Sequence, residues 1–396
     1  MLSRLSLVAI VFCLVGIPLV RADEKEAVRR PAASQPLAGT KLLEWDGDLA
    51  ARMVDDLHAF ADRETAASVA RRTKHFRPDF ANPAAYQKSL EPNRARLRKY
   101  LGVGDPEARN AETPGSGFAG ELLDEMGEGS GPGYTSSHYV LRGLNGIQTD
   151  LYILKPDVPK DVLAPAIILL PDADQSPEAL IGVDEKLPDV SAVAREFVQS
   201  GFCVVVPRLI NRDHRHSTVA KGLKKTMQPH REFVYRQAFE MGRHVIGYEL
   251  EMIRTLTDYL TFVSPFDRPR LAVAGYGEGG LLALYAAALD PRLEVVGVSG
   301  YFGPREAVWD EPIYRDVWGL LDEFGDAELA AMIAPNRLIV ETSAGPKTSE
   351  PPKSPDGPLR VTPGTLKNPP ASAVRGRSIA RCGCCRRRRR GKSRFR

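Results

Sequence analysis

A glycine-rich turn stands between a predicted strand and a predicted helix, in the segment Leu271-Ala-Val-Ala-Gly-Tyr-Gly-Glu-Gly-Gly280. That order is typical of the nucleophile elbow Gly-x-Ser-x-Gly, in which small residues flank a strained turn and the nucleophile's side chain stands clear of the sheet. Gly275, Gly279 and Gly280 take the flanking small positions, but the nucleophile position is Gly277. Because glycine has no side chain, this turn offers no atom for nucleophilic attack.

The electrophilic half of such a site remains possible. The backbone N–H of Glu278 lies at a predicted helix N-terminus, where it could bind an oxyanion together with an N–H from the loop at Asp172 and Ala173. This pair could hold a carboxylate or a carbonyl oxygen without breaking a bond. The Glu278 side chain could serve as an acid or a base, but a solvated carboxylate in a first helical turn is the simpler expectation.

A second polar cluster follows the predicted strand 203–206. It comprises Asn211-Arg-Asp-His-Arg-His216 and Gln228-Pro-His-Arg231. Loops after parallel strands lie at the ligand-binding edge of a sheet. We therefore predict an anion-binding lid, with a solvated loop as the alternative, from His214, His216, His230 and Arg231. His-x-His without a third fixed ligand is a poor indication of a metal site, and we expect no metal and no cofactor.

The elements that must position these residues follow from the apolar pattern. Five almost wholly apolar runs predict parallel strands that helices bury on both faces: 166–170, 203–206, 271–274, 295–298 and 338–340. Two amphipathic runs, 138–141 and 150–154, predict an antiparallel start. Helices are expected near 188–200, 231–262 and 279–289. The pattern predicts an α/β fold with a mostly parallel sheet flanked by helices.

The segment before this sheet is predicted to be helical. Residues 45–72 carry an amphipathic stripe at the 3.6-residue period, made by Leu49, Met53, Val54, Leu57, Phe60 and Ala61. A second helix is expected from Pro92, in its first turn, to Gly104. We therefore assign 45–104 to a helical N-terminal section, 105–133 to a linker and 134–342 to the α/β domain.

The two ends of the chain are predicted to lie outside this fold. One basic residue, Arg4, precedes an apolar run of 16 residues within 1–22, which indicates a signal peptide cleaved before Asp23 and a secreted or periplasmic protein without a membrane span. A Pro-containing linker, 23–44, follows. The Pro-rich and then Arg/Cys-rich segment 343–396 is predicted to be a disordered tail. From about residue 365 its composition is also what a shifted GC-rich reading frame yields.

The composition of the chain limits the classes of function that it can have. The chain has 396 residues, 43% of them hydrophobic and 26% charged, which is typical of a globular protein. The formal net charge is +4, but the last 22 residues contain eleven Lys and Arg and no acid, so the remaining body is net acidic. We therefore expect no nucleic acid to bind the folded body, whereas the tail could bind a polyanion. Oligomeric state is not readable from the sequence.

Residues 136–341 resemble an α/β-hydrolase of the dienelactone hydrolase, acetyl xylan esterase and prolyl-oligopeptidase-like group. The resemblance rests on Ala166-Ile-Ile-Leu-Leu-Pro171, Gly201-Phe-Cys-Val-Val-Val-Pro207, Asp267-Arg-Pro-Arg270 and Ile333-Ala-Pro-Asn-Arg-Leu-Ile-Val340. It implies an α/β-hydrolase fold that normally gains one further strand, which this chain lacks after 338–340. That strand would then form a sheet edge.

The resemblance also implies a Ser-His-Asp apparatus, and the residues do not supply it. The nucleophile maps to Gly277, and the only carboxylate at the acid position is Glu341. The family's histidine follows the elbow in the chain, but all seven histidines precede it: His58, His75, His138, His214, His216, His230 and His244. Nucleophilic attack requires a base within hydrogen-bond reach of the nucleophile.

Three functions remain open. The residues favour a non-catalytic relative, a pseudoenzyme that binds an ester- or carboxylate-bearing small molecule or glycan. The family resemblance alone favours an active esterase or peptidase with an unidentified nucleophile and base. The third alternative is polyanion binding through the basic tail.

Overall fold

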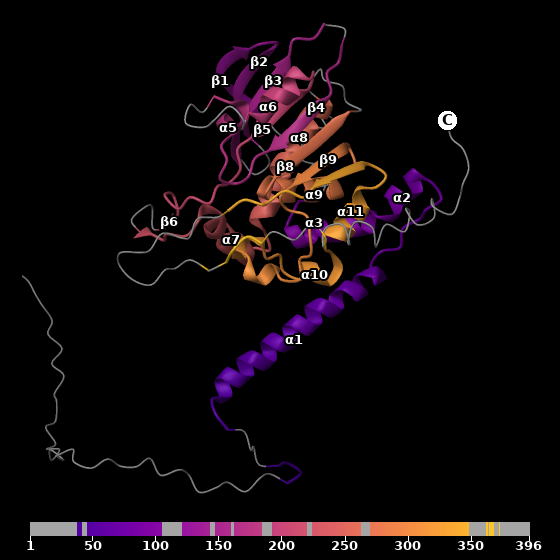
Figure 1. Ribbon diagram of the computed structural model, residues 1–396, viewed down its shortest axis with the longest axis vertical. Helices are drawn as coiled ribbons and strands as arrows, with labels where there is room; N and C mark the ends of the chain where they lie inside the picture. Colours follow the sequence, from indigo (N-terminus) through magenta and orange to yellow (C-terminus); the bar gives the residue numbers. More distant parts are fainter. Residues whose placement is uncertain are drawn as a thin grey trace, which may run out of the picture. The chain divides into compact units, whose positions relative to one another are not determined.

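The computed structural model describes residues 38–41, 46–104, 121–142, 147–159, 162–183, 192–219, 224–262, 270–347, 362, 364–367 and 372. The chain divides into two compact units, Met1–Leu57 and His58–Arg396. The second unit carries the sheet (Figure 1). The predicted signal peptide and most of the predicted tail lie outside the described residues. No helix in the described part of the chain is long and apolar enough to cross a membrane.

An eight-stranded mixed sheet forms the centre of the second unit, in the order β1-β2-β3-β5-β4-β8-β9-β10. The five strands from β5 to β10 in this order run parallel, while β1, β2 and β3 pair antiparallel. The predicted fold class and all seven predicted strands are confirmed. The strands are β1 (Glu121–Gly131), β2 (Tyr134–Arg142), β3 (Gln148–Pro156), β4 (Ala166–Leu170), β5 (Cys203–Pro207), β8 (Leu271–Tyr276), β9 (Leu293–Ser299) and β10 (Arg337–Glu341). A separate two-stranded ribbon consists of β6 (Thr218–Val219) and β7 (Lys224–Lys225).

Strand β1 lies within the segment that we assigned to a linker. It pairs with β2 across the turn at Pro132 and Gly133, and its register is irregular around Glu125. The strand has no clean alternation of apolar and polar residues, so the periodicity that reveals the other strands is absent here. The Pro-Gly turn was the available signal.

The described residues form the helices α1 (Leu49–Arg71), α2 (Pro83–Ser89), α3 (Glu91–Leu101), α5 (Pro177–Ile181), α6 (Val193–Gln199), α7 (His230–Glu240), α8 (Val245–Phe262), α9 (Glu278–Leu289), α10 (Leu320–Glu323) and α11 (Asp326–Ile333), with short 3₁₀ turns η1 (Arg72–Lys74), η4 (Val308–Asp310) and η5 (Ile313–Arg315). Of these, α3, α8, α9 and α11 pack on one face of the sheet, and α5 and α6 pack on the other. The single helix expected at 231–262 is two helices. The break occurs at Gly242, whose φ of +63° a right-handed helix does not allow.

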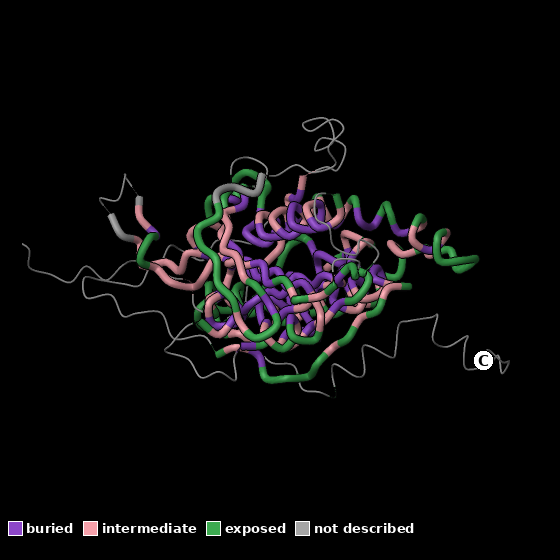
Figure 2. The backbone as a smooth tube through the Cα atoms, turned by 90° about the horizontal axis from the view of Figure 1, so that it is seen from above, coloured by how far each residue is buried: buried purple, intermediate pink, exposed green. Residues whose placement is uncertain are grey.

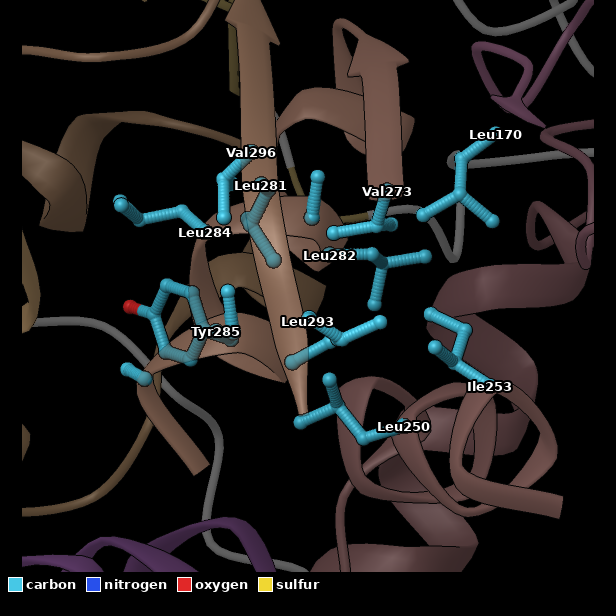
Figure 3. Packing of buried hydrophobic residues seen from close by; sticks show 14 of the residues in the cluster. Leu170, Leu250, Ile253, Val273, Leu281, Leu282, Leu284, Tyr285, Leu293 and Val296 are labelled. Atoms are coloured by element: carbon cyan, nitrogen blue, oxygen red, sulfur yellow. The ribbon is translucent and has the colours of Figure 1, made fainter. Parts of the chain in front are cut away.

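Successive side chains of β4 point to opposite faces of the sheet and pack into two separate cores. Ile168 and Leu170 face the larger core with α3, α8, α9 and α11, and Ile167 and Leu169 face the smaller one with α5 and α6. Figure 3 shows side chains of α8 and α9 meeting those of β8 and β9. The buried parts of the chain gather at the centre of the second unit, between exposed segments (Figure 2). The helix α3 belongs to this core, because Leu97 and Leu101 are fully buried in it.

Candidate functional site

The glycine-rich turn joins β8 to α9 at the carboxyl edge of the sheet. Gly277 has a φ of +58°, and its N–H donates to the carbonyl of Ser299 at 3.0 Å. A Cβ at Gly275, Gly279 or Gly280 would come within 3 Å of backbone atoms. These three glycines therefore let α9 begin directly against the sheet, as the small positions of a nucleophile elbow do.

The space above Gly277 is filled by other parts of the chain. A Cβ at this position would come within 3 Å of Asp172 Oδ1 and Pro346 Cγ. Asp172 follows β4, and Pro346 follows β10. The geometry thus preserves the strained turn of an elbow, while a carboxylate and a proline ring stand where a nucleophile's side chain would project.

Asp172 also occupies the backbone amide that we predicted to bind an oxyanion. Its Oδ1 accepts the hydrogen bond of the Glu278 N–H at 2.9 Å, and its side chain is almost fully buried. The neighbouring Ala173 is buried as well. The structure therefore brings Asp172, Gly277 and Glu278 together as expected, but the acceptor at the amide is the chain's own carboxylate.

Arg212 fixes this carboxylate in place. Its guanidinium binds Asp172 through two hydrogen bonds, of 2.6 and 3.1 Å, and its Nε donates to the hydroxyl of Tyr314 at 2.8 Å. A further bond of 2.9 Å reaches the more exposed Asp174. Paired, planar contacts of this type are the strong form of an arginine–carboxylate interaction.

Glu278 is buried among arginines, so the expectation of a solvated carboxylate is wrong. Its exposed fraction is 0%, and its Oε1 accepts from Arg315 at 2.9 Å and from Arg212 at 3.2 Å. Burial raises the pKa of Glu278, but the charges of Arg315, Arg231 and Arg212 outweigh burial and lower the pKa to about 2. Glu278 is therefore ionised at neutral pH and has no proton to donate as a general acid.

Arg231, which we predicted in an anion-binding lid, lies inside the same buried network. It is fully buried and forms a two-bond ion pair with Glu249 of α8 at 2.7 and 2.9 Å. Its Nη2 is 3.9 Å from Glu278 Oε2. The sequence placed Arg231 at the start of α7 correctly, but the partner from α8 neutralises it and removes it from the surface.

Of the three lid histidines, His214 and His216 lie between β5 and α7, and His230 is the first residue of α7. His230 Nδ1–H donates to Asn211 Oδ1 at 2.6 Å, and His230 Nε2 accepts from the His216 N–H at 3.0 Å. The rings of His216 and His230 stack at 5.4 Å, and His214 Nδ1 is 3.7 Å from Asp213 Oδ1. Both ring nitrogens of His230 are engaged, and burial lowers its pKa, so the ring is held neutral.

Glu341, the candidate acid, ends β10 and is exposed. Its Oε2 accepts from Ser299 Oγ at 2.5 Å, and Ser299 Oγ lies 2.7 Å from Ser343 Oγ. Tyr276 donates to the carbonyl of Ala344 at 2.9 Å. The residues after β10 therefore lie against the elbow, within the segment that we had placed in a disordered tail from residue 343.

A cavity of about 610 Å³ opens beside the elbow, over one face of β4, β8, β9 and β10. Its wall includes Ala272, Ala274 and Ile339, and its polar lining includes Gln175, Ser299 and Glu341. The cavity combines an apolar wall with hydroxyl, amide and carboxylate groups, which is the composition of a small-ligand site.

Sequence reasoning missed Arg212, Arg315, Glu249 and Ser299. Arg212 belongs to the polar run that we singled out, but neither its burial nor its partner can be read from that run. Arg315 and Glu249 lie far from the elbow in sequence, and their pairing arises only from the fold.

The comparisons with known proteins concern the fold. Residues 150–319 match the Dienelactone hydrolase family. No curated protein matches the chain. A candidate acetyl xylan esterase from Bacteroides fragilis is similar in structure, with a TM-score of 0.50 and 17% identity, covering 67% of this chain and 70% of that one. A glucuronoyl esterase from Solibacter usitatus has a TM-score of 0.43 and 17% identity, covering 67% and 77%.

The chain therefore has an α/β-hydrolase-type fold. Within that fold its resemblance is to the dienelactone hydrolase group, over the residues that build the centre of the sheet and the elbow.

Proposed function

We propose that this protein is an exported, non-hydrolytic member of the α/β-hydrolase fold that binds an ester- or carboxylate-bearing small molecule or glycan. One observation carries the proposal: Asp172 stands over Gly277 and accepts the Glu278 N–H. A hydrolase needs at this point a nucleophile and a free amide for the oxyanion. Here the first is missing and the second is already bonded.

The electrostatics of the elbow support the same conclusion. A developing oxyanion at the Glu278 amide would have to displace Asp172, which Arg212 holds by two hydrogen bonds. Displacing a buried, paired carboxylate raises the energy of this negatively charged transition state, because it leaves Arg212 without its partner.

The choice of ligand rests on the cavity beside the elbow and on the relatives. The cavity presents an apolar wall and a few polar groups, and the structurally similar proteins are named as esterases of acetyl xylan and of glucuronoyl groups. Export is supported by the apolar run that precedes Asp23. Mass spectrometry of the mature protein should find an N-terminus near Asp23, and retention of Met1 would refute the export.

The test is hydrolysis of aryl esters and of acetylated xylo-oligosaccharides. We expect the wild type to turn over these esters no faster than an unrelated protein. Gly277→Ser alone should also be inactive, because a serine without a base is hardly ionised at neutral pH. Gly277→Ser with His214→Ala, His216→Ala or His230→Ala then tests whether any lid histidine serves as a base. Clear turnover by the wild type would overturn the proposal.

An active hydrolase remains the second candidate because of Ser299. Its hydroxyl donates to Glu341 at 2.5 Å at the rim of the cavity, which is the contact a nucleophile makes with a general base. The assay therefore includes Ser299→Ala. Turnover that this substitution abolishes would establish Ser299 as the nucleophile, whereas absence of turnover in both forms supports the non-hydrolytic function.

A further inference from the structure

A second cavity lies among α3, the end of α7 and the loop after η5, and none of its lining residues belongs to the elbow network. Its volume is about 510 Å³. Three cations and three aromatic rings line it: Arg96, Lys99, Tyr100, Phe239, Arg243 and Trp318. A cavity with both an aromatic and a cationic lining selects among ligands, because a ligand must offer it both an apolar face and a negative charge.

The aromatic side of the cavity is open to solvent. Trp318 has an exposed fraction of 78% and Phe239 of 46%. Tyr100 is packed edge-on against Phe324 at 6.0 Å, so its ring is fixed. Large exposed aromatic side chains that gather in one place mark a binding surface, since a soluble protein gains nothing by leaving an indole in water.

The cationic side of the cavity carries charges without a carboxylate partner among the described residues. Arg96 is paired with Glu323 at 2.6 Å, but Arg243 donates to the backbone carbonyl of Gly102. Among the ion pairs of the described residues, neither Lys99 nor Arg243 has a carboxylate partner. Two positive charges therefore face the aromatic rings in a body that is otherwise net acidic.

The floor of the cavity adds a fixed, neutral wall. His244 is buried, its Nδ1 accepts from the Ile246 N–H at 3.1 Å, and its Nε2 donates to the Asp316 carbonyl at 3.2 Å. Burial lowers the pKa of His244 to about 4, so the ring is uncharged at neutral pH. The attraction for an anion therefore comes from Lys99 and Arg243 and not from His244.

We propose that this cavity binds an acidic saccharide: the apolar face of a pyranose ring packs on Trp318, and a ring carboxylate pairs with Lys99 and Arg243. The aromatic faces match the C–H face of a sugar, and a carboxylate offers the acceptors that two cations need. The acidic body around the cavity disfavours a long nucleic acid, because it would repel the rest of that chain. This site is independent of the elbow and of the proposed function there.

The experiment is calorimetric titration with tetragalacturonate, with the uncharged galactotetraose and with adenosine monophosphate. We expect tetragalacturonate to bind and the two other probes not to bind, and 0.5 M salt to weaken the binding. Trp318→Ala should weaken it at least about tenfold and Lys99→Glu about fivefold. The matched controls Trp309→Ala and Lys88→Glu, which change an exposed tryptophan and an exposed lysine elsewhere, should leave it unchanged.

Retention of the wild-type thermal midpoint by Trp318→Ala and Lys99→Glu separates loss of binding from loss of folding. The two proposals fail separately, because ester turnover tests the elbow and tetragalacturonate binding tests this cavity, and the cavities at the two places share no lining residue. Equal affinity for the uncharged sugar, binding of the nucleotide alone, absence of binding, or indifference to Trp318→Ala would each overturn the proposal.

Discussion

The carboxylate of Asp172 accepts the N–H of Glu278 at 2.9 Å, across more than a hundred residues of sequence. In an elbow with a serine, this amide would face the oxygen of a reacting ester. Here the protein supplies its own anion, and Arg212 holds that anion with two further hydrogen bonds. The amide that would bind an oxyanion thus makes a structural hydrogen bond, and this bond stabilises the turn.

We expect Asp172→Asn to destabilise the protein. The substitution keeps the shape but removes a buried charge from Arg212, and breaking a buried pair costs about 3–5 kcal/mol. Asp174→Asn is the matched control, because Asp174 also bonds Arg212 at 2.9 Å but is exposed, and it should cost less than about 1 kcal/mol. Urea unfolding measures both. Equal losses for the two variants would contradict a buried anchoring role for Asp172.

Gly277→Ala should cost more than Gly201→Ala. Both glycines have positive φ, which costs an L-residue about 1–2 kcal/mol. A Cβ at Gly201 meets open space, whereas one at Gly277 meets Asp172 and Pro346. The difference in the free energy of unfolding between the two variants therefore reports the crowding above the elbow. If Gly277→Ala loses no more free energy of unfolding than Gly201→Ala, the space above Gly277 is not filled.

The stability should fall steeply in acid because of Glu278. Its pKa is about 2 in the folded protein and about 4.3 in an unfolded chain. A lowered pKa contributes stability that is present above the unfolded value and is lost as pH falls towards 2, here about 3 kcal/mol. Glu278→Gln should be less stable than the wild type at pH 7 and show a flatter decline between pH 5 and 2.5. Parallel pH curves for the two proteins would rule out this role.

Strand β10 should make the protein associate at high concentration. Within the described residues it pairs only with β9, and Ile339 on it is 48% exposed. An antiparallel pairing of two copies centred on Ile339 would place Arg337 opposite Glu341 of the second copy. Sedimentation velocity should find dimers that Ile339→Lys removes and that Val183→Lys, at another exposed apolar site, does not. A monomer at all concentrations would refute the pairing.

Most of the sheet could be predicted because its strands are short apolar runs that can be recognised in the sequence. The apolar run at Ala166–Leu170 matches β4, and the glycine spacing at Gly275 and Gly279 identified the elbow. Both features depend on neighbours in sequence. The strand β1 lacks such a pattern, and the break at Gly242 depends on one residue's backbone angle.

The content of the site could be predicted only in part. The absence of a nucleophile at Gly277 is a property of one residue, so the sequence establishes it. The burial of Glu278 and Arg231 cannot be read from the sequence. It depends on Arg315 and Glu249, which approach from other elements. Charged residues of this kind usually lie at the surface. Here they are buried because each forms an ion pair with a residue of opposite charge.

The most direct test of the central claim is reaction with a fluorophosphonate, which modifies an activated serine covalently. The purified wild type is incubated with the reagent, and the intact mass and its peptides are measured, with a serine esterase as the positive control. Because Gly277 offers no nucleophile and Asp172 occupies the amide, the account predicts no adduct on the wild type. A stoichiometric adduct on Ser299, or on any other serine, would contradict it.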